Sequence, residues 1–172
     1  MSARAVLRRR VCAVLMDHTL ADERVYGTLT LPILNRKLKV GPIVLVYLLA
    51  ERPRDRVHGA GTWEIDLAVE AVVTNDSEAD ERLDALIESI VLILTEDPLL
   101  NGAPEGDQTA LAETAVHDRT EVGLAVIEGG PVEALVARLS FTVTVHRPET
   151  GGGRPASVAR AGIVGAPHRP AA

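Results

Sequence analysis

The chain has 172 residues, of which 47% are hydrophobic and only 2% are aromatic, and its formal net charge is -6. This length and apolar content suffice for one domain with a real core and exclude a disordered protein. The scarcity of aromatic rings disfavours binding of single-stranded nucleic acid, which depends on base stacking. The acidic balance disfavours a duplex-binding domain, which usually presents a basic face.

Cysteine content and hydropathy indicate in which cellular compartment the chain is located. The single cysteine, Cys12, excludes an internal disulfide and a cysteine-rich zinc site, so we expect a buried, inert thiol. The apolar run at residues 11–16 is too short for a signal-peptide core. No stretch reaches the roughly 18 apolar residues of a membrane-spanning helix. We therefore expect a soluble chain that is made in the cytoplasm and has no membrane partner.

Residues 3–17 have the pattern of a first helix. One apolar stripe at helical spacing consists of Leu7, Val11, Val14 and Leu15. Three consecutive arginines, at positions 8–10, lie beside this stripe, and we expect them to form a solvated face. The alternative is that they contact an acidic partner or a phosphate.

Two strand-like segments follow. Residues 24–31 favour a strand whose pairing is limited by Pro32, and residues 35–39 favour a turn or loop. Gly41 and Pro42 then open a continuously apolar run at residues 43–49, which is typical of a central strand covered on both faces.

Residues 51–61 are charged and contain two glycines, so we predict an extended hairpin loop between two strands. Its arginines, Arg52, Arg54 and Arg56, are the candidate interface residues of this segment. The alternative is an ordinary solvated loop.

Residues 62–74 alternate as a half-buried strand, and a helix follows them to about Thr95. The apolar face of the strand is formed by Trp63, Ile65, Leu67, Val69, Ala71 and Val73, whereas the opposite face is mostly polar. Asp76 or Ser77 is the expected N-cap of the helix, and Pro98 ends it. Its buried stripe is formed by Leu83, Leu86, Ile87, Ile90, Val91 and Leu94.

The sequence pattern of the last third of the domain predicts a β-hairpin. After a polar loop at residues 101–109, residues 110–115 could form a short helical turn or an irregular strand. Val122, Leu124 and Val126 alternate as a strand, and residues 134–145 form the last strand. A Gly-Gly turn at positions 129–130 between them indicates an antiparallel pair.

Glycine and proline dominate residues 148–172, which we separate from a domain at residues 1–147. This segment is locally basic, and it predicts either a disordered tail or an arm that becomes ordered on a neighbouring subunit. In the second case Arg160 would contribute charge, and Ile163 and Val164 would be the apolar anchor.

No pattern of reaction chemistry is present in the sequence. The five histidines are not paired at helical metal-binding spacing, and there is no phosphate-binding loop, dinucleotide fingerprint or nucleophile elbow. His117 and Asp118 form an isolated dipeptide in an expected loop and are the weak candidate for proton transfer. We therefore expect no enzyme activity, no cofactor and no metal.

The order of elements resembles that of the tail terminator (tail completion) proteins of long-tailed bacteriophages. The resemblance covers roughly residues 3–147. It lies in the order of the elements and in the residues that begin and end them, rather than in a diagnostic motif. A basic first helix precedes Arg24-Val25-Tyr26, and a proline introduces the apolar strand Gly41-Pro42-Ile43-Val44-Leu45-Val46-Tyr47. The 63–74 strand runs directly into the 76–95 helix, which Asp97-Pro98-Leu99-Leu100-Asn101-Gly102 closes, and the 121–145 hairpin comes last.

This resemblance implies an α+β domain with a mixed, mostly antiparallel sheet of about five strands that two helices cover on one face. It also implies a homohexameric ring that caps the tail tube protein, stops tube elongation and docks on the head-tail connector. Genome DNA would pass through the lumen without being read, and the chain would be located in the virion. The family has no catalytic residues to transfer.

Two alternatives remain at this point. The chain could be another neck or head-completion protein, which would bind the portal or connector but not tail tubes. It could also be a small α/β enzyme subunit or ligand-binding domain with a site near residues 107–118. A pocket that gathers Glu113, His117 and Asp118 would favour the last alternative.

Overall fold

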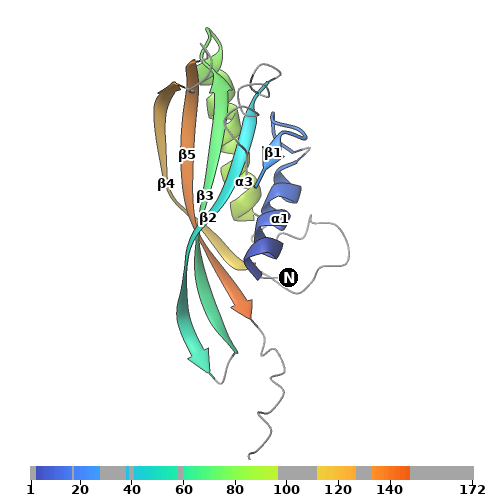
Figure 1. The fold of residues 1–172 in the computed structure, drawn as a ribbon, viewed down its shortest axis with the longest axis vertical. Coiled ribbons are helices and arrows are strands. Elements are labelled where there is room, and N and C mark those ends of the chain that lie inside the picture. Colours follow the sequence, from blue (N-terminus) through green and yellow to red (C-terminus); the bar gives the residue numbers. More distant parts are fainter. Residues whose placement is uncertain are drawn as a thin grey trace, which may run out of the picture.

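The computed structural model describes residues 3–16, 18–27, 38, 41–57, 60–96, 112–126 and 133–147. The elements in chain order are α1 (Ala3–Leu15), β1 (Val25–Tyr26), β2 (Ile43–Val57), β3 (Ala60–Thr74), α3 (Ala79–Glu96), β4 (Ala112–Val126) and β5 (Glu133–Arg147). Five strands form one sheet in the order β1-β2-β3-β5-β4 (Figure 1). Only the β1–β2 pair is parallel. The predicted α+β class is thus confirmed.

The middle of the sheet is β3, which is paired along its whole length with β2 on one side and β5 on the other. Its alternation directs one set of side chains to the helices, as the sequence predicts. Five of these side chains, Ile65, Leu67, Val69, Ala71 and Val73, are at most 1% exposed. Opposite them, β5 contributes Leu139 and Phe141 to the same core.

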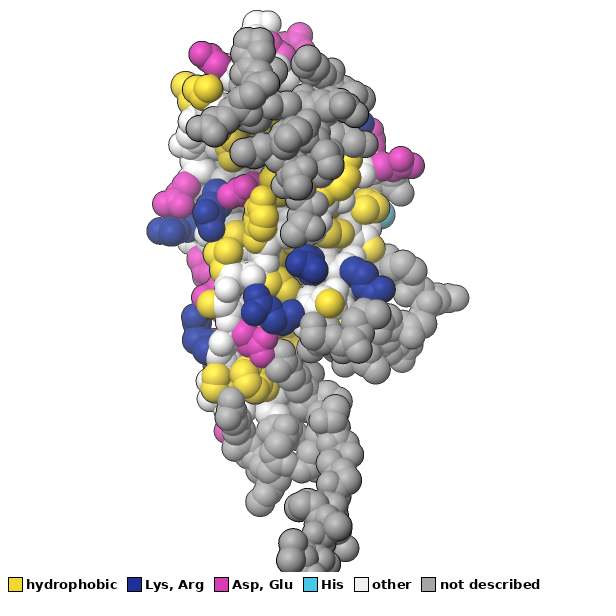
Figure 2. Space-filling view, viewed as in Figure 1, with side chains coloured by type: hydrophobic (Ala, Val, Ile, Leu, Met, Phe, Trp, Pro, Cys, Tyr) yellow, Lys and Arg dark blue, Asp and Glu magenta, His cyan; other side chains and the backbone are white. Residues whose placement is uncertain are grey.

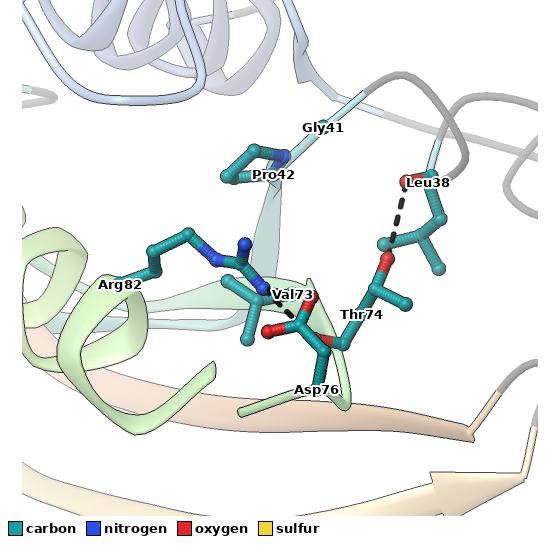
Figure 3. A pocket seen from close by; sticks show the side chains of 7 residues that line it. All are labelled: Leu38, Gly41, Pro42, Val73, Thr74, Asp76 and Arg82. Atoms are coloured by element: carbon teal, nitrogen blue, oxygen red, sulfur yellow. Dashed lines mark hydrogen bonds and ion pairs between the residues drawn. The ribbon is translucent and has the colours of Figure 1, made fainter. Parts of the chain in front are cut away.

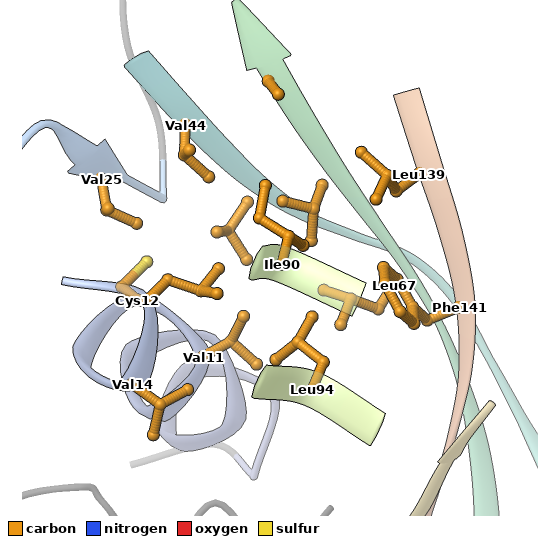
Figure 4. Packing of buried hydrophobic residues seen from close by; sticks show 14 of the residues in the cluster. Val11, Cys12, Val14, Val25, Val44, Leu67, Ile90, Leu94, Leu139 and Phe141 are labelled. Carbon is orange, nitrogen blue, oxygen red and sulfur yellow. The ribbon is translucent and has the colours of Figure 1, made fainter. Parts of the chain in front are cut away.

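Both helices lie on this apolar face of the sheet (Figure 4). The predicted stripe of α1 is buried, and so are Leu83, Leu86, Ile90 and Leu94 of α3. Asp76 caps α3, because its Oδ1 accepts a hydrogen bond from the backbone N–H of Glu78 at 3.0 Å. The first-turn carboxylates of Asp80 and Glu81 suit the positive end of the helix dipole.

The opposite face of the sheet has a smaller apolar cluster at one end, formed by Leu38, Ile43, Leu45, Val72 and Ala134. The start of β2 is therefore covered on both faces, as predicted, but only as far as Val46, since Leu49 is 52% exposed. The expectation that β2 is central is confirmed at its start, where β1 pairs with Val44 and Leu45, but beyond Leu45 its one strand neighbour among the described residues is β3.

A long hairpin replaces the loop predicted at residues 51–61. Strand β2 continues to Val57 and β3 begins at Ala60, so most of this segment is antiparallel ribbon. Charged side chains can occupy such a ribbon because the four successive residues 52–55, which alternate between its two faces, are all exposed. Pro53 is tolerated because β2 is an outer strand at this point, and the register shifts next to it.

Strand β4 is also longer than predicted. The sequence allows a helical turn or an irregular strand at residues 110–115, and the described part of this segment belongs to a strand that runs from Ala112 to Val126. The register shifts at Glu113 and again at Asp118, so β4 carries two bulges. These bulges, together with its charged residues, interrupt the alternation from which a continuous strand is recognised.

The arginines at positions 8–10 do not form a uniform solvated face. Arg9 is exposed and Arg8 is half-buried, whereas only 7% of Arg10 is exposed. Gly27 allows the close approach of the Arg8 side chain, because a Cβ at position 27 would lie 3.0 Å from the Cδ atom of Arg8. Arg24 ties β1 to β2 by donating from Nε to the carbonyl of Pro42 at 2.9 Å.

The first prediction compares two leucines on neighbouring strands. Leu139 on β5 is fully buried, whereas Leu124 on β4 is 69% exposed. Leu139→Ala should lower the free energy of unfolding by about 2–5 kcal/mol, because it leaves a cavity in the core. Leu124→Ala should change it by less than about 0.5 kcal/mol. Urea denaturation of both variants measures the difference, and equal losses would contradict this core assignment.

The second prediction concerns the buried thiol. Burial raises the pKa of Cys12 from its ordinary value of 9.0 to about 11, an effect that the positive charge of Arg8 partly offsets. Between these two pH values the unfolded chain loses the thiol proton while the folded chain keeps it, so stability should fall as pH rises. The fall due to this group should reach about 2–3 kcal/mol.

Denaturation at pH 8 and pH 11 of the wild-type chain and of Cys12→Ala isolates the contribution of the thiol. The other groups titrate in both proteins, so the pH-dependent loss should be smaller in the variant. Parallel pH profiles would show that the thiol does not resist ionisation in the folded chain.

Candidate interaction surface

The ribbon formed by the second half of β2 and the first half of β3 carries a network of charges. Arg52 donates from Nε to Oε2 of Glu64 at 2.9 Å and from Nη1 to Oδ2 of Asp66 at 3.1 Å. The hydrogen bond to Glu64 is the main reason why the pKa of Arg52 is raised above its ordinary value. One guanidinium thus bridges two carboxylates that lie two residues apart on one face of β3.

Of the other candidate contact residues, Arg54 is the one whose side chain the structure describes. Arg54 is also on β2, and its Nε lies 3.9 Å from Oε1 of Glu64, with 63% of the side chain exposed. Arg56 is a strand residue whose side chain lies outside the described part, and Arg160, Ile163 and Val164 lie outside the described residues altogether. The structure therefore brings Arg52 and Arg54 together around Glu64.

The rest of the sheet face turned away from the helices continues this mixture of charges. Arg138 of β5 lies 3.7 Å from Glu70 of β3, and Arg119 of β4 lies 3.6 Å from Glu121. Figure 2 shows dark-blue and magenta side chains close together on the visible surface, with hydrophobic groups between them. Burial of Tyr47 and the neighbouring carboxylate of Glu70 raise the pKa of the Tyr47 hydroxyl. This face offers paired charges rather than a field of one sign.

An apolar row at the end of β4 was not recognised as a surface in the sequence. Val122, Leu124 and Val126 are 58%, 69% and 77% exposed. They stand opposite Ala137, Leu135 and Glu133 of β5, so they point to the helix side of the sheet. The alternation identified the strand, but only the position of β4 at the edge of the sheet leaves these side chains uncovered.

A basic pocket lies where α1 meets β2. It has a volume of about 260 Å³ and is lined by Arg4, Ala5, Arg8 and Leu48. Arg4 donates from Nη2 to the carbonyl oxygen of Leu48 at 2.6 Å. The helical spacing of Arg4 and Arg8 places both guanidinium groups on the side of α1 that faces the edge of β2.

A second pocket, of about 380 Å³, lies between the start of β2 and the start of α3 (Figure 3). Its charged groups are Arg82 and Asp76, which form an ion pair with each other. The hydrogen bond from Arg82 holds the pKa of Asp76 below its ordinary value, and Arg82 also donates to the carbonyl of Thr74 at 3.2 Å. This pair fastens α3 to the end of β3 and leaves little net charge for a ligand.

The His117-Asp118 dipeptide does not form a proton-transfer pair. The expectation that it lies in a loop is wrong, since both residues are in β4 at a bulge. The ring of His117 packs on Phe141 with centroids 5.2 Å apart, and its Nε2 lies 2.9 Å from the hydroxyl of Thr120. Asp118 instead accepts a hydrogen bond from Thr142, which is on the opposite face of β5.

The described segments have neither a metal-binding cluster nor a membrane-spanning helix. In those segments no group of three or more His, Cys, Asp or Glu side chains is placed to hold a metal ion. No helix in the same segments is long and apolar enough to span a bilayer. Comparison with the profiles of known protein families and with curated proteins gives no match.

The third prediction concerns the charge network on the ribbon. Arg52→Ala leaves Glu64 and Asp66 side by side without the bridging guanidinium, so the variant should be slightly less stable at low salt. The difference should shrink as salt is added, because exposed charges are screened. Urea midpoints at low and high sodium chloride measure it. Arg54→Ala is the matched control, and its smaller loss should reflect the longer distance to Glu64.

Proposed function

We propose that this chain is a structural virion protein that forms a ring on the end of a phage tail tube. In this role it stops tube elongation and provides the docking surface for the head-tail connector. Its partners are further copies of itself, the tail tube protein and a connector or neck protein, with DNA only passing through the lumen. The chain performs no catalysis in this role and needs no cofactor.

One observation carries the proposal. Among the described elements, α1 and α3 cover one face of the five-stranded sheet, while much of the other face and the protruding ribbon present paired charges of both signs. A polar sheet face of this kind can line a water-filled lumen or contact a neighbouring subunit. Because its charges have both signs, it would not present a continuous positive surface to which DNA could bind tightly. The element order that resembles the tail terminator family supports the same role.

The alternative of an enzyme or ligand-binding domain near residues 107–118 draws no support from the described residues. The side chains of His117 and Asp118 make separate contacts with neighbouring residues of β5, and these contacts lie on opposite faces of the sheet. A neck or head-completion role differs from the terminator role in its binding partner, so the experiment must separate these two.

The fourth prediction is a particle phenotype. Particles produced without this chain should carry tails of excessive and variable length that are not joined to full heads, because nothing would stop the tube from growing. Negative-stain microscopy measures tail length and head attachment, and supplying the wild-type chain in trans should restore both. Tails of normal length that fail to join heads would indicate a neck protein instead, and unchanged particles would contradict any assembly role.

A further inference from the structure

Exposed apolar side chains are concentrated on β4, at one edge of the sheet. Among the described residues the large exposed ones are Leu20, Leu49, Leu92, Val116, Val122, Leu124 and Val126. Four of them are on β4, Leu49 is on β2, Leu20 precedes β1, and only Leu92 is on the outer side of a helix. Scattered apolar residues need no explanation, but four of them on one edge strand indicate a surface that is covered in an assembly.

Among the described residues both edges lack a second strand neighbour, although Arg4 donates to the carbonyl of Leu48 in β2. Within the described residues β4 is paired only with β5, and β2 beyond Leu45 is paired only with β3. We call these the β4 edge (residues 112–126) and the β2 edge (residues 46–57 together with Arg4 and Arg8 of α1). Since each neighbouring pair from β2 to β4 is antiparallel, β2 and β4 run in opposite directions.

The charges of the two edges are opposite. The β4 edge has three carboxylates, of Glu113, Asp118 and Glu121, and one arginine, Arg119. The β2 edge has four arginines whose side chains are described, at positions 4, 8, 52 and 54, and two carboxylates, at positions 51 and 55; Arg52 is in addition paired with Glu64 and Asp66 of β3. Pairing of two β4 edges would bring like charges together, whereas pairing of a β4 edge with a β2 edge brings opposite charges together.

We propose that the β4 edge of one copy of this chain pairs with the β2 edge of the next copy, antiparallel and head to tail. The inference deepens the proposed ring and rests on it for its biological setting. Two different surfaces meet in this contact, so repetition generates a closed ring when the rotation permits closure. The occupant of the apolar row on β4 is therefore a second copy of the chain and not an unrelated protein.

The helix layer explains how the apolar row would be covered. In each copy α1 packs on the helix side of β2 through the core cluster that contains Val11, Val44 and Val46. When the β2 edge joins a neighbour's β4 edge, this α1 lies next to the helix side of that β4. Val122, Leu124 and Val126 point to that side, so α1 of one copy would extend the helix layer over the row of the other.

The fifth prediction is tested by cross-linking in the purified chain. In a Cys12→Ala background, Val122→Cys is placed in one tagged copy and Leu49→Cys in another, and the mixture is treated with a short bis-maleimide. Cross-linked dimers should contain one copy of each kind, because the two edges meet. A cysteine at Glu81, which is exposed on α3, is the control and should give almost no dimer.

The outcomes separate this inference from the proposed function. Dimers of two Val122→Cys copies would show a symmetric contact, and the absence of dimers would show no such contact; either result overturns the inference. Leu124→Lys should in addition abolish self-association in sedimentation velocity, whereas Leu92→Lys, at a similarly exposed position on α3, should not. Mixed dimers together with unchanged particles in the deletion experiment would leave the interface standing and reject the phage role alone.

Discussion

Burial of the helix side of β3 is the constraint on which the rest of this structure depends. Five alternate side chains of this strand are almost completely inaccessible, and hydrogen-bonded strands lie on both of its sides. Aliphatic burial of this kind is the main favourable term in folding, and with so few aromatic residues the chain has no other large source of it. The helices α1 and α3 are therefore held where they cover β3 and its two neighbours.

The width of the sheet then decides what remains exposed. The described helices, α1 and α3, leave the end of β4 open, and the apolar row from Val122 to Val126 lies beyond them. On the opposite face, the apolar cover is confined to the end near Leu38 and Val72, and the remainder of the sheet balances its charges in pairs. The candidate surfaces are thus consequences of a sheet larger than its helix layer.

Much of this fold could be predicted from local patterns. Hydrophobic periodicity identified β3, β5 and α3, because the burial of each side chain in these elements follows from its spacing along the chain. The cap at Asp76 identified the start of α3. The hairpin at residues 51–61 was predicted as a loop, and its strand pairing could not be recognised because that pairing is not local. Arg52 is held by Glu64 and Asp66, which are twelve and fourteen residues away.

The candidate surface was less predictable than the fold for the same reason. The sequence singled out Arg52 and Arg54, but it could not indicate that one of them is largely satisfied by its own carboxylates. Nor could it distinguish an exposed edge strand from a covered one. Val122 and Val143 look alike as alternating valines, yet one is 58% exposed and the other 2%. That difference is set by strand order.

The way in which β4 is protected argues for a specific contact rather than for indiscriminate aggregation. Natural edge strands are blocked by bulges and charges, and the first part of β4 has both, with register shifts at Glu113 and Asp118. Protection ends after Glu121, where three apolar side chains follow one another on a single side. On the other edge, Arg4 occupies the carbonyl of Leu48. A chain selected only to remain monomeric would have a reason to block the whole of β4, so a partly open edge is better explained by a partner of matching shape and opposite charge.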